Sequence, residues 1–117
     1  VVGFTDRVSE YMAASDLILS KPGGITLFEC IFSQLPMLAW GPFLQQERLN
    51  ARYLLQADIG RIACKEPSAC LEAIRSLIYS DDTLSRMSAN MGRLKEQLEV
   101  EGIDRAVAML TGAEVCA

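Results

Sequence analysis

Short apolar runs alternate with longer amphipathic segments along this chain. Three of the runs, at residues 17–20, 37–40 and 61–64, are bounded by turn residues and fit buried strands of a parallel sheet. Residues 1–4 resemble the end of a further buried strand. The pattern therefore predicts a sheet of about four strands.

The segments between the predicted strands have helical periodicity, because apolar residues recur in them at i, i+3 and i+4. The predicted helices cover residues 7–14, 25–33, 46–57, 67–79, 83–100 and 103–110. Thr5 or Asp6 is expected to cap the first helix, and Gly102 is expected to end the long one.

This alternation of strands and helices predicts right-handed βαβ units, and hence an α/β fold with helices on both faces of a parallel sheet. We expect a single domain at residues 1–112 and a frayed tail at residues 113–117.

Composition narrows the class of protein. Of 117 residues, 50% are apolar and 22% are charged, which is enough to bury a core and excludes a disordered chain. No apolar run is long enough to span a bilayer, and no signal peptide pattern is present, so we expect a cytoplasmic protein. The net charge is −4 and the basic residues are scattered, which argues against a nucleic-acid partner.

Cysteine and histidine content excludes further classes of site. The four cysteines form no CxxC pair and the chain has no histidine, so neither a zinc ribbon, a redox pair nor another metal site is predicted. Because histidine is the commonest general base, acid–base chemistry would need a carboxylate or another part of a larger protein.

The carboxyl ends of parallel strands are where such sheets bind ligands. The turn after residue 20 contains Gly23 and Gly24 and leads into a helix near Thr26. Glycine lets backbone approach a ligand closely, and a helix start carries partial positive charge, so this turn fits a phosphate or diphosphate site. The same turn also fits an ordinary strand-to-helix connection in which the glycines serve tight packing.

Polar side chains follow the glycine turn and the next strand. Glu29 lies about one helical turn past the glycines, where a carboxylate could accept hydrogen bonds from the two hydroxyls of a ribose. Gln46, Glu47 and Asn50 share one face at the start of the next predicted helix and could bind sugar hydroxyls. The alternative for Glu29 is a solvated position on the outer face of its helix. The alternative for Gln46, Glu47 and Asn50 is that they cap their helix and contact solvent.

Phe4 and Thr5 follow the first apolar run. The Phe4 ring could stack on a base, and the backbone of Thr5 could bind the edge of that base. A core position for Phe4 is the alternative.

Four segments in this order, residues 3–6, 14–29, 35–36 and 46–51, resemble the carboxyl-terminal part of GT-B glycosyltransferases. The similarity is to the diacylglycerol glycosyltransferases (monogalactosyldiacylglycerol synthases and processive glucosyltransferases) and, more distantly, to the peptidoglycan N-acetylglucosaminyltransferase. It extends well over residues 1–64. One departure is Gln45, where the lipid-glycosylating relatives often have glycine before the Gln-Glu pair.

The resemblance implies a Rossmann-like, partial GT-B carboxyl-terminal domain that binds a UDP-sugar. Carried over to this chain, the implied contacts follow the order of the donor's parts. Phe4 and Thr5 would meet uracil. Gly23, Gly24 and Thr26 would meet the diphosphate, and Glu29 would accept from the ribose hydroxyls. Gln46, Glu47 and Asn50 would face the donor sugar or the phosphate next to it.

The resemblance also implies an inverting transfer of a hexose to a lipid-type acceptor, with no cofactor besides the donor. The catalytic base and the acceptor would belong to an amino-terminal domain or partner chain, so this chain alone is expected to be inactive. An exposed sheet edge predicts self-association, for example a homodimer. The full protein would be cytoplasmic or peripheral to a membrane.

Three alternatives remain open. One is a nucleotide-sugar-binding or partner-binding module without catalysis. Another is a UDP-sugar 2-epimerase, which the Ser20-Lys21-Pro22 sequence disfavours because those enzymes usually carry Asp-Ser before the glycine pair. The last is a flavodoxin-like domain with no nucleotide role.

Overall fold

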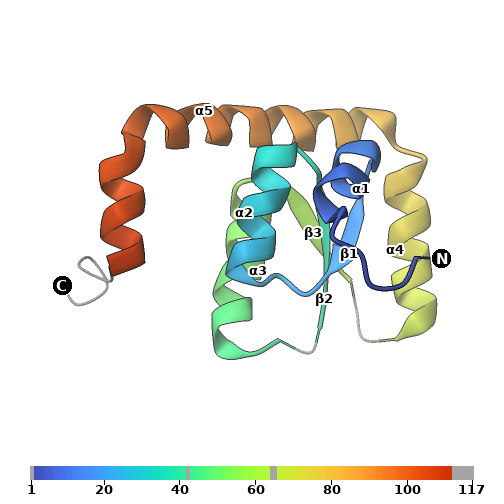
Figure 1. Ribbon diagram of the computed structural model, residues 1–117. Helices are drawn as coiled ribbons and strands as arrows, with labels where there is room; N and C mark the ends of the chain where they lie inside the picture. Colours follow the sequence, from blue (N-terminus) through green and yellow to red (C-terminus); the bar gives the residue numbers. More distant parts are fainter. Residues whose placement is uncertain (1, 42, 64–65, 112–117) are drawn as a thin grey trace.

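The computed structural model describes residues 2–41, 43–63 and 66–111. Eight elements follow one another along the chain (Figure 1). They are α1 (Val8–Ala14), β1 (Ile18–Ser20), α2 (Gly24–Ser33), β2 (Met37–Trp40), α3 (Gln45–Gln56), β3 (Gly60–Ala63), α4 (Pro67–Ile78) and α5 (Asp81–Thr111). Cys64, predicted to end a strand, and residues 113–117, the predicted tail, lie outside the described residues.

The sheet is parallel, with strand order β1-β2-β3. It has three strands within the described residues, rather than about four. Residues 2–4, which we predicted to end a strand, are irregular, and Phe4 is fully exposed rather than buried. So short a segment offers few backbone groups for a ladder, and no packing partner covers the Phe4 ring.

One face of the sheet is covered by α2 and α3. Met37 and Ala39 of β2 pack there with Leu27 and Ile31 of α2 and with Leu54 of α3. All five side chains are buried. This cluster forms the larger part of the core.

The opposite face is covered by α4. Leu38, which alternates with its neighbours in β2, packs there against Cys70 and Leu77 of α4 and Met87 of α5. Helices on both faces of a parallel sheet confirm the predicted fold class.

The close approach of β3 to β2 explains why position 60 is a glycine. A Cβ atom on Gly60 would overlap the backbone carbonyl oxygen of Met37 on the neighbouring strand. Only glycine lets β3 begin at this distance from β2.

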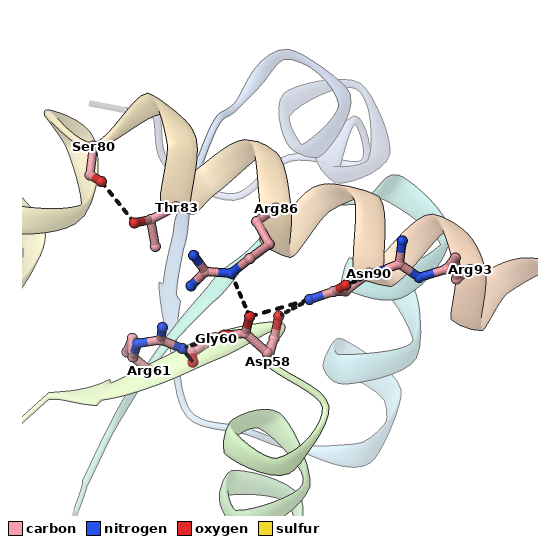
Figure 2. Close-up of polar contacts among 8 residues, drawn as sticks. All are labelled: Asp58, Gly60, Arg61, Ser80, Thr83, Arg86, Asn90 and Arg93. Carbon is pink, nitrogen blue, oxygen red and sulfur yellow. Dashed lines mark hydrogen bonds and ion pairs between the residues drawn. The ribbon is translucent and has the colours of Figure 1, made fainter.

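Helix α5 runs across the amino-terminal ends of the strands (Figure 1). It is fastened there by the residues that precede β2 and β3. The Ser88 hydroxyl donates to the Gln34 carbonyl at 3.0 Å. Figure 2 shows the second set of contacts, in which Arg86 Nε and Asn90 Nδ2 donate to Asp58 at 2.6 and 2.8 Å. The loops at the carboxyl-terminal ends of the strands therefore lie on the side of the sheet away from α5.

Two predicted helix boundaries are wrong. Helix α5 continues through Gly102 to Thr111, and its axis turns toward the end, as Figure 1 shows. A single glycine costs a helix only about 1 kcal/mol relative to alanine, which does not have to end it. At the other end of the chain α1 begins at Val8 with Arg7 as its N-cap, and the Thr5 hydroxyl accepts the Arg7 N–H at 3.0 Å instead of capping the helix itself.

Candidate donor-binding edge

The carboxyl-terminal edge of the sheet gathers the starts of two helices. The turn after β1 leads directly into α2, and the loop after β2 leads into α3. Seven of the nine residues predicted to bind the donor lie in these two helices or in the turn before α2. We describe first the glycine turn and then the polar face of α3.

The glycine turn is built around Pro22, whose side chain is fully buried. The Gly23 N–H donates to the Lys21 carbonyl at 2.9 Å, which closes a tight turn with Pro22 at its centre. The Ser20 hydroxyl donates to the same carbonyl at 3.0 Å. The N–H of Gly23 is therefore used inside the turn and does not face a ligand.

The first turn of α2 leaves backbone donors unpaired. The first intrahelical hydrogen bond runs from the Leu27 N–H to the Gly23 carbonyl, and no side chain caps the helix. The N–H groups of Gly24, Ile25 and Thr26 precede this bond and have no partner within the helix. They form, with the helix dipole, a place where an anion is stabilised.

Neither glycine of the turn is required by the chain itself. Gly23 has an ordinary φ of −68°, and a Cβ atom on Gly23 or Gly24 would meet nothing within 4 Å. Packing within the chain therefore does not account for the glycine pair. The open space beside both positions fits the close approach of a ligand.

Glu29 lies on the exposed side of α2, one turn beyond the glycine turn. Its side of the helix also carries Ile25, Phe28 and Phe32, all of them exposed, with Ile25 at 80%. The next residue, Cys30, is fully buried. Burial, with a smaller contribution from the nearby Glu29 charge, raises the pKa of the Cys30 thiol to about 11. This side of α2 is therefore accessible to a ligand, whereas the thiol behind it is not.

The start of α3 is hydrogen-bonded to both loops. Glu47 Oε1 accepts the Leu44 N–H at 2.8 Å and so caps its own helix. Asn50 Nδ2 donates to the Pro22 carbonyl oxygen at 2.8 Å, a contact that spans 28 positions of sequence. Gln46 is exposed. Helix capping, the alternative noted for this group, is thus confirmed for Glu47.

Phe4 and Thr5 lie apart from these helices in the irregular segment before α1. The Thr5 hydroxyl is engaged by the Arg7 N–H, and the Phe4 ring is free to contact a partner. The structure therefore brings together the glycine turn and the α3 face, and it adds Pro22, which was not among the predicted site residues. A proline directly before two glycines was the available signal in the sequence.

A hollow on this chain lies away from the glycine turn. It has a volume of about 1160 Å³ and is lined by residues that include Ser15, Asp16, Gln34 and Ser88. Because Gln34 precedes β2 and Ser88 lies on α5, the hollow is at the amino-terminal edge. It does not coincide with the glycine turn.

Comparison with known proteins identifies the family. The profile of the glycosyltransferase family 28 C-terminal domain matches residues 1–103. The chain belongs to this family. The resemblance found in the ordered motifs is thereby confirmed, as is membership of a glycosyltransferase family.

Similar curated proteins of this family are named as processive diacylglycerol beta-glucosyltransferases. The one from Staphylococcus saprophyticus is 38% identical over 91 residues, which cover 78% of this chain and 23% of the relative. The one from Staphylococcus aureus is 32% identical over 112 residues, which cover 96% of this chain and 28% of the relative. The chain thus spans about a quarter of the length of these relatives.

A solved structure, the glycotransferase of kitacinnamycin, supports the fold. It superposes with a TM-score of 0.67 at 20% identity, over 88% of this family 28 domain and 26% of that chain. In the described part of the chain, no helix combines the length and apolar content needed to cross a membrane.

Proposed function

We propose that this chain binds the UDP-sugar donor of an inverting glycosyltransferase. The observation that carries the proposal is the uncapped start of α2, which presents the N–H groups of Gly24, Ile25 and Thr26 beside open space. A diphosphate is the part of such a donor that three convergent N–H groups and a helix dipole stabilise best. Membership of the glycosyltransferase family 28 C-terminal domain supports the same ligand class.

The other donor contacts follow from position along α2 and α3. The Thr26 hydroxyl adds a donor to the diphosphate site, and Glu29, exposed one turn further, accepts from the ribose hydroxyls. Gln46, exposed at the start of α3, meets the sugar. Phe4, whose ring is exposed, and Thr5 meet the uracil from the segment before α1.

In the transfer step, the acceptor hydroxyl oxygen forms a bond to the anomeric carbon while the bond from that carbon to the diphosphate oxygen breaks. The electron pair of the broken bond leaves with UDP, whose growing negative charge is stabilised by the start of α2. The hydroxyl proton passes to a base outside this chain. The acceptor is a lipid-type alcohol, by analogy with the relatives named as diacylglycerol glucosyltransferases.

Calorimetric titration with UDP tests the proposal directly. The parent chain should bind UDP, and Glu29→Gln should weaken UDP about tenfold because a charged acceptor for two hydroxyls is lost. The same substitution should weaken the binding of 2′-deoxy-UDP by a smaller factor than that of UDP, because this analogue has only one of the two hydroxyls. Glu96→Gln, an equivalent change at an exposed position of α5, serves as the control. Absence of UDP binding by the parent chain would refute the function.

A protein partner is the second part of the proposal. β1 and β3 are the outer strands of the described sheet, and Leu19 on β1 is 45% exposed. An exposed strand edge with an apolar side chain favours pairing with an acceptor domain, a partner chain or a second copy. Light scattering over a concentration series should reveal association, and a monomer at every concentration would remove the second copy from the proposal.

A further inference from the structure

One peptide unit links the helix that faces the sugar to the turn that faces the diphosphate. It is the peptide between Pro22 and Gly23. Its carbonyl oxygen accepts from Asn50 Nδ2 at 2.8 Å, and its N–H donates to the Lys21 carbonyl at 2.9 Å. Because a peptide unit is planar, hydrogen bonds at both of its ends fix the direction of the plane.

The direction of this peptide determines how the chain enters α2. Gly23 is the N-cap of α2, and the unpaired N–H groups begin at the next residue. A rotation of the Pro22–Gly23 peptide would therefore redirect the N–H groups of Gly24 and Ile25. The bond from Asn50 is the one long-range hydrogen bond to this peptide that the described residues contain.

The amide orientation of Asn50 follows from chemistry. Only the NH₂ group can face a carbonyl oxygen, since the amide oxygen has no proton to donate. The neighbouring Glu47, three residues earlier on the same face, binds the Leu44 N–H in the other loop. The side chains of Asn50 and Glu47 thus each form a hydrogen bond with a loop beside the helix.

We propose that Asn50 is a positioning residue for the diphosphate site, acting through the Pro22–Gly23 peptide rather than through contact with the sugar. The inference rests on the proposed binding of a UDP-sugar. It makes a distinctive claim about ligands: UDP, which lacks the sugar, depends on Asn50 as strongly as UDP-glucose does.

The test compares two ligands and two kinds of variant. Asn50→Asp keeps the size of the side chain but removes the donor, and Asn50→Ala removes the amide without placing a carboxylate against the Pro22 carbonyl. Gln46→Ala, an exposed change on the same helix, is the matched control. Affinities for UDP and UDP-glucose are measured by calorimetry well below the melting temperature, where global stability does not alter affinity. Hydrogen exchange of the hydrogen-bonded Gly23 and Leu27 amides, which flank the unpaired ones, is measured in the absence of ligand.

Both Asn50 variants should weaken UDP and UDP-glucose by the same factor, roughly five- to tenfold, as expected for loss of one hydrogen bond. The Gly23 and Leu27 amides should exchange faster than in the parent. Gln46→Ala should change the ratio of the two affinities and leave the exchange of these two amides unaltered.

Two results would overturn the inference. One is weakening of UDP-glucose alone, which would make Asn50 a sugar contact. The other is unchanged exchange at the Gly23 and Leu27 amides in both Asn50 variants, which would show that the hydrogen bond does not hold the turn. Failure of the parent chain to bind UDP refutes the donor-binding function instead, and the exchange measurement then still decides whether Asn50 fixes the turn.

Discussion

Asp58 joins the start of β3 to α5, and its replacement gives the sharpest test of how the amino-terminal edge is held. The carboxylate accepts hydrogen bonds from Arg61 Nη1 at 2.9 Å and Arg86 Nε at 2.6 Å, while its backbone carbonyl accepts from Asn90 (Figure 2). Asp58 also has a φ of 53°, in the left-handed region that asparagine, aspartate and glycine adopt more readily than other residues.

The expected loss can be estimated from these contacts. The Asp58 side chain is 35% exposed, so solvent screening limits the two ion pairs to about 1 kcal/mol together. Asp58→Asn keeps the left-handed backbone and should therefore cost about 1 kcal/mol. Asp58→Ala also places alanine in the left-handed region, which adds roughly 1 kcal/mol, for a total of about 2 kcal/mol. Asp58→Gly removes the carboxylate but adopts this φ freely. Its difference in unfolding free energy from Asp58→Ala therefore measures the cost of the left-handed backbone separately from the loss of the ion pairs.

Urea unfolding followed by far-ultraviolet circular dichroism measures these differences. With a typical dependence of the unfolding free energy on urea concentration (the m-value), a loss of about 1 kcal/mol corresponds to a midpoint shift of roughly 0.5 M urea. Equal midpoints for the parent and Asp58→Asn at pH 7 would show that the ion pairs contribute nothing measurable.

The pH dependence provides an independent check. Hydrogen bonds from Arg86 and then Arg61 lower the pKa of Asp58 below its usual range. A lowered pKa in the folded state means that the stabilisation is complete above about pH 4, the ordinary value for aspartate. It is lost as pH falls through the lowered value. The difference between the parent and Asp58→Asn should therefore shrink on acidification, and a constant difference down to pH 3 would refute the reasoning.

Three further predictions concern single positions. Gly24→Ala should raise stability by about 0.5 kcal/mol in thermal melts, because its Cβ meets no atom of the chain, yet it should weaken UDP at least tenfold in calorimetry; undiminished UDP affinity would remove the diphosphate from this position. Gly60→Ala should destabilise the chain by about 2 kcal/mol in urea titrations because of overlap with the Met37 carbonyl, and a wild-type midpoint would contradict the close strand contact. Cys30, buried and with its pKa raised to about 11, should resist alkylation by iodoacetamide at pH 8 until urea unfolds the chain; rapid labelling of the folded chain, read by peptide mass spectrometry, would contradict its burial.

Local sequence patterns predicted most of the elements. The strand at residues 37–40 is found as predicted, because an apolar run between Pro36 and Gly41 leaves few other choices. Helix starts and ends elsewhere differ by one or two residues from the predicted ones. The failures have a common physical cause, which is that both features depend on more than the local sequence pattern. A strand at residues 1–4 needs a neighbouring strand, and whether Gly102 ends its helix is not decided by the adjacent residues alone.

The site was predictable only in part for a related reason. The glycine turn and the start of α2 are contiguous in sequence, so their anion-binding character is visible in the spacing of Gly23, Gly24 and Thr26. The Asn50–Pro22 hydrogen bond joins residues 28 positions apart, and no local pattern encodes it. Sequence therefore indicated which residues are polar near the edge, but not which of them are already engaged by the backbone.

The strands of this sheet are three or four residues long, which separates the Asp58 contacts from the glycine turn by roughly 10 Å or more along the strand direction. Substitutions that far apart, without shared partners, usually have additive effects. Substitutions that strengthen the contacts between Asp58 and α5 could therefore be combined in one molecule with substitutions in α3 that alter ligand preference. Neither change should need much re-optimisation for the other.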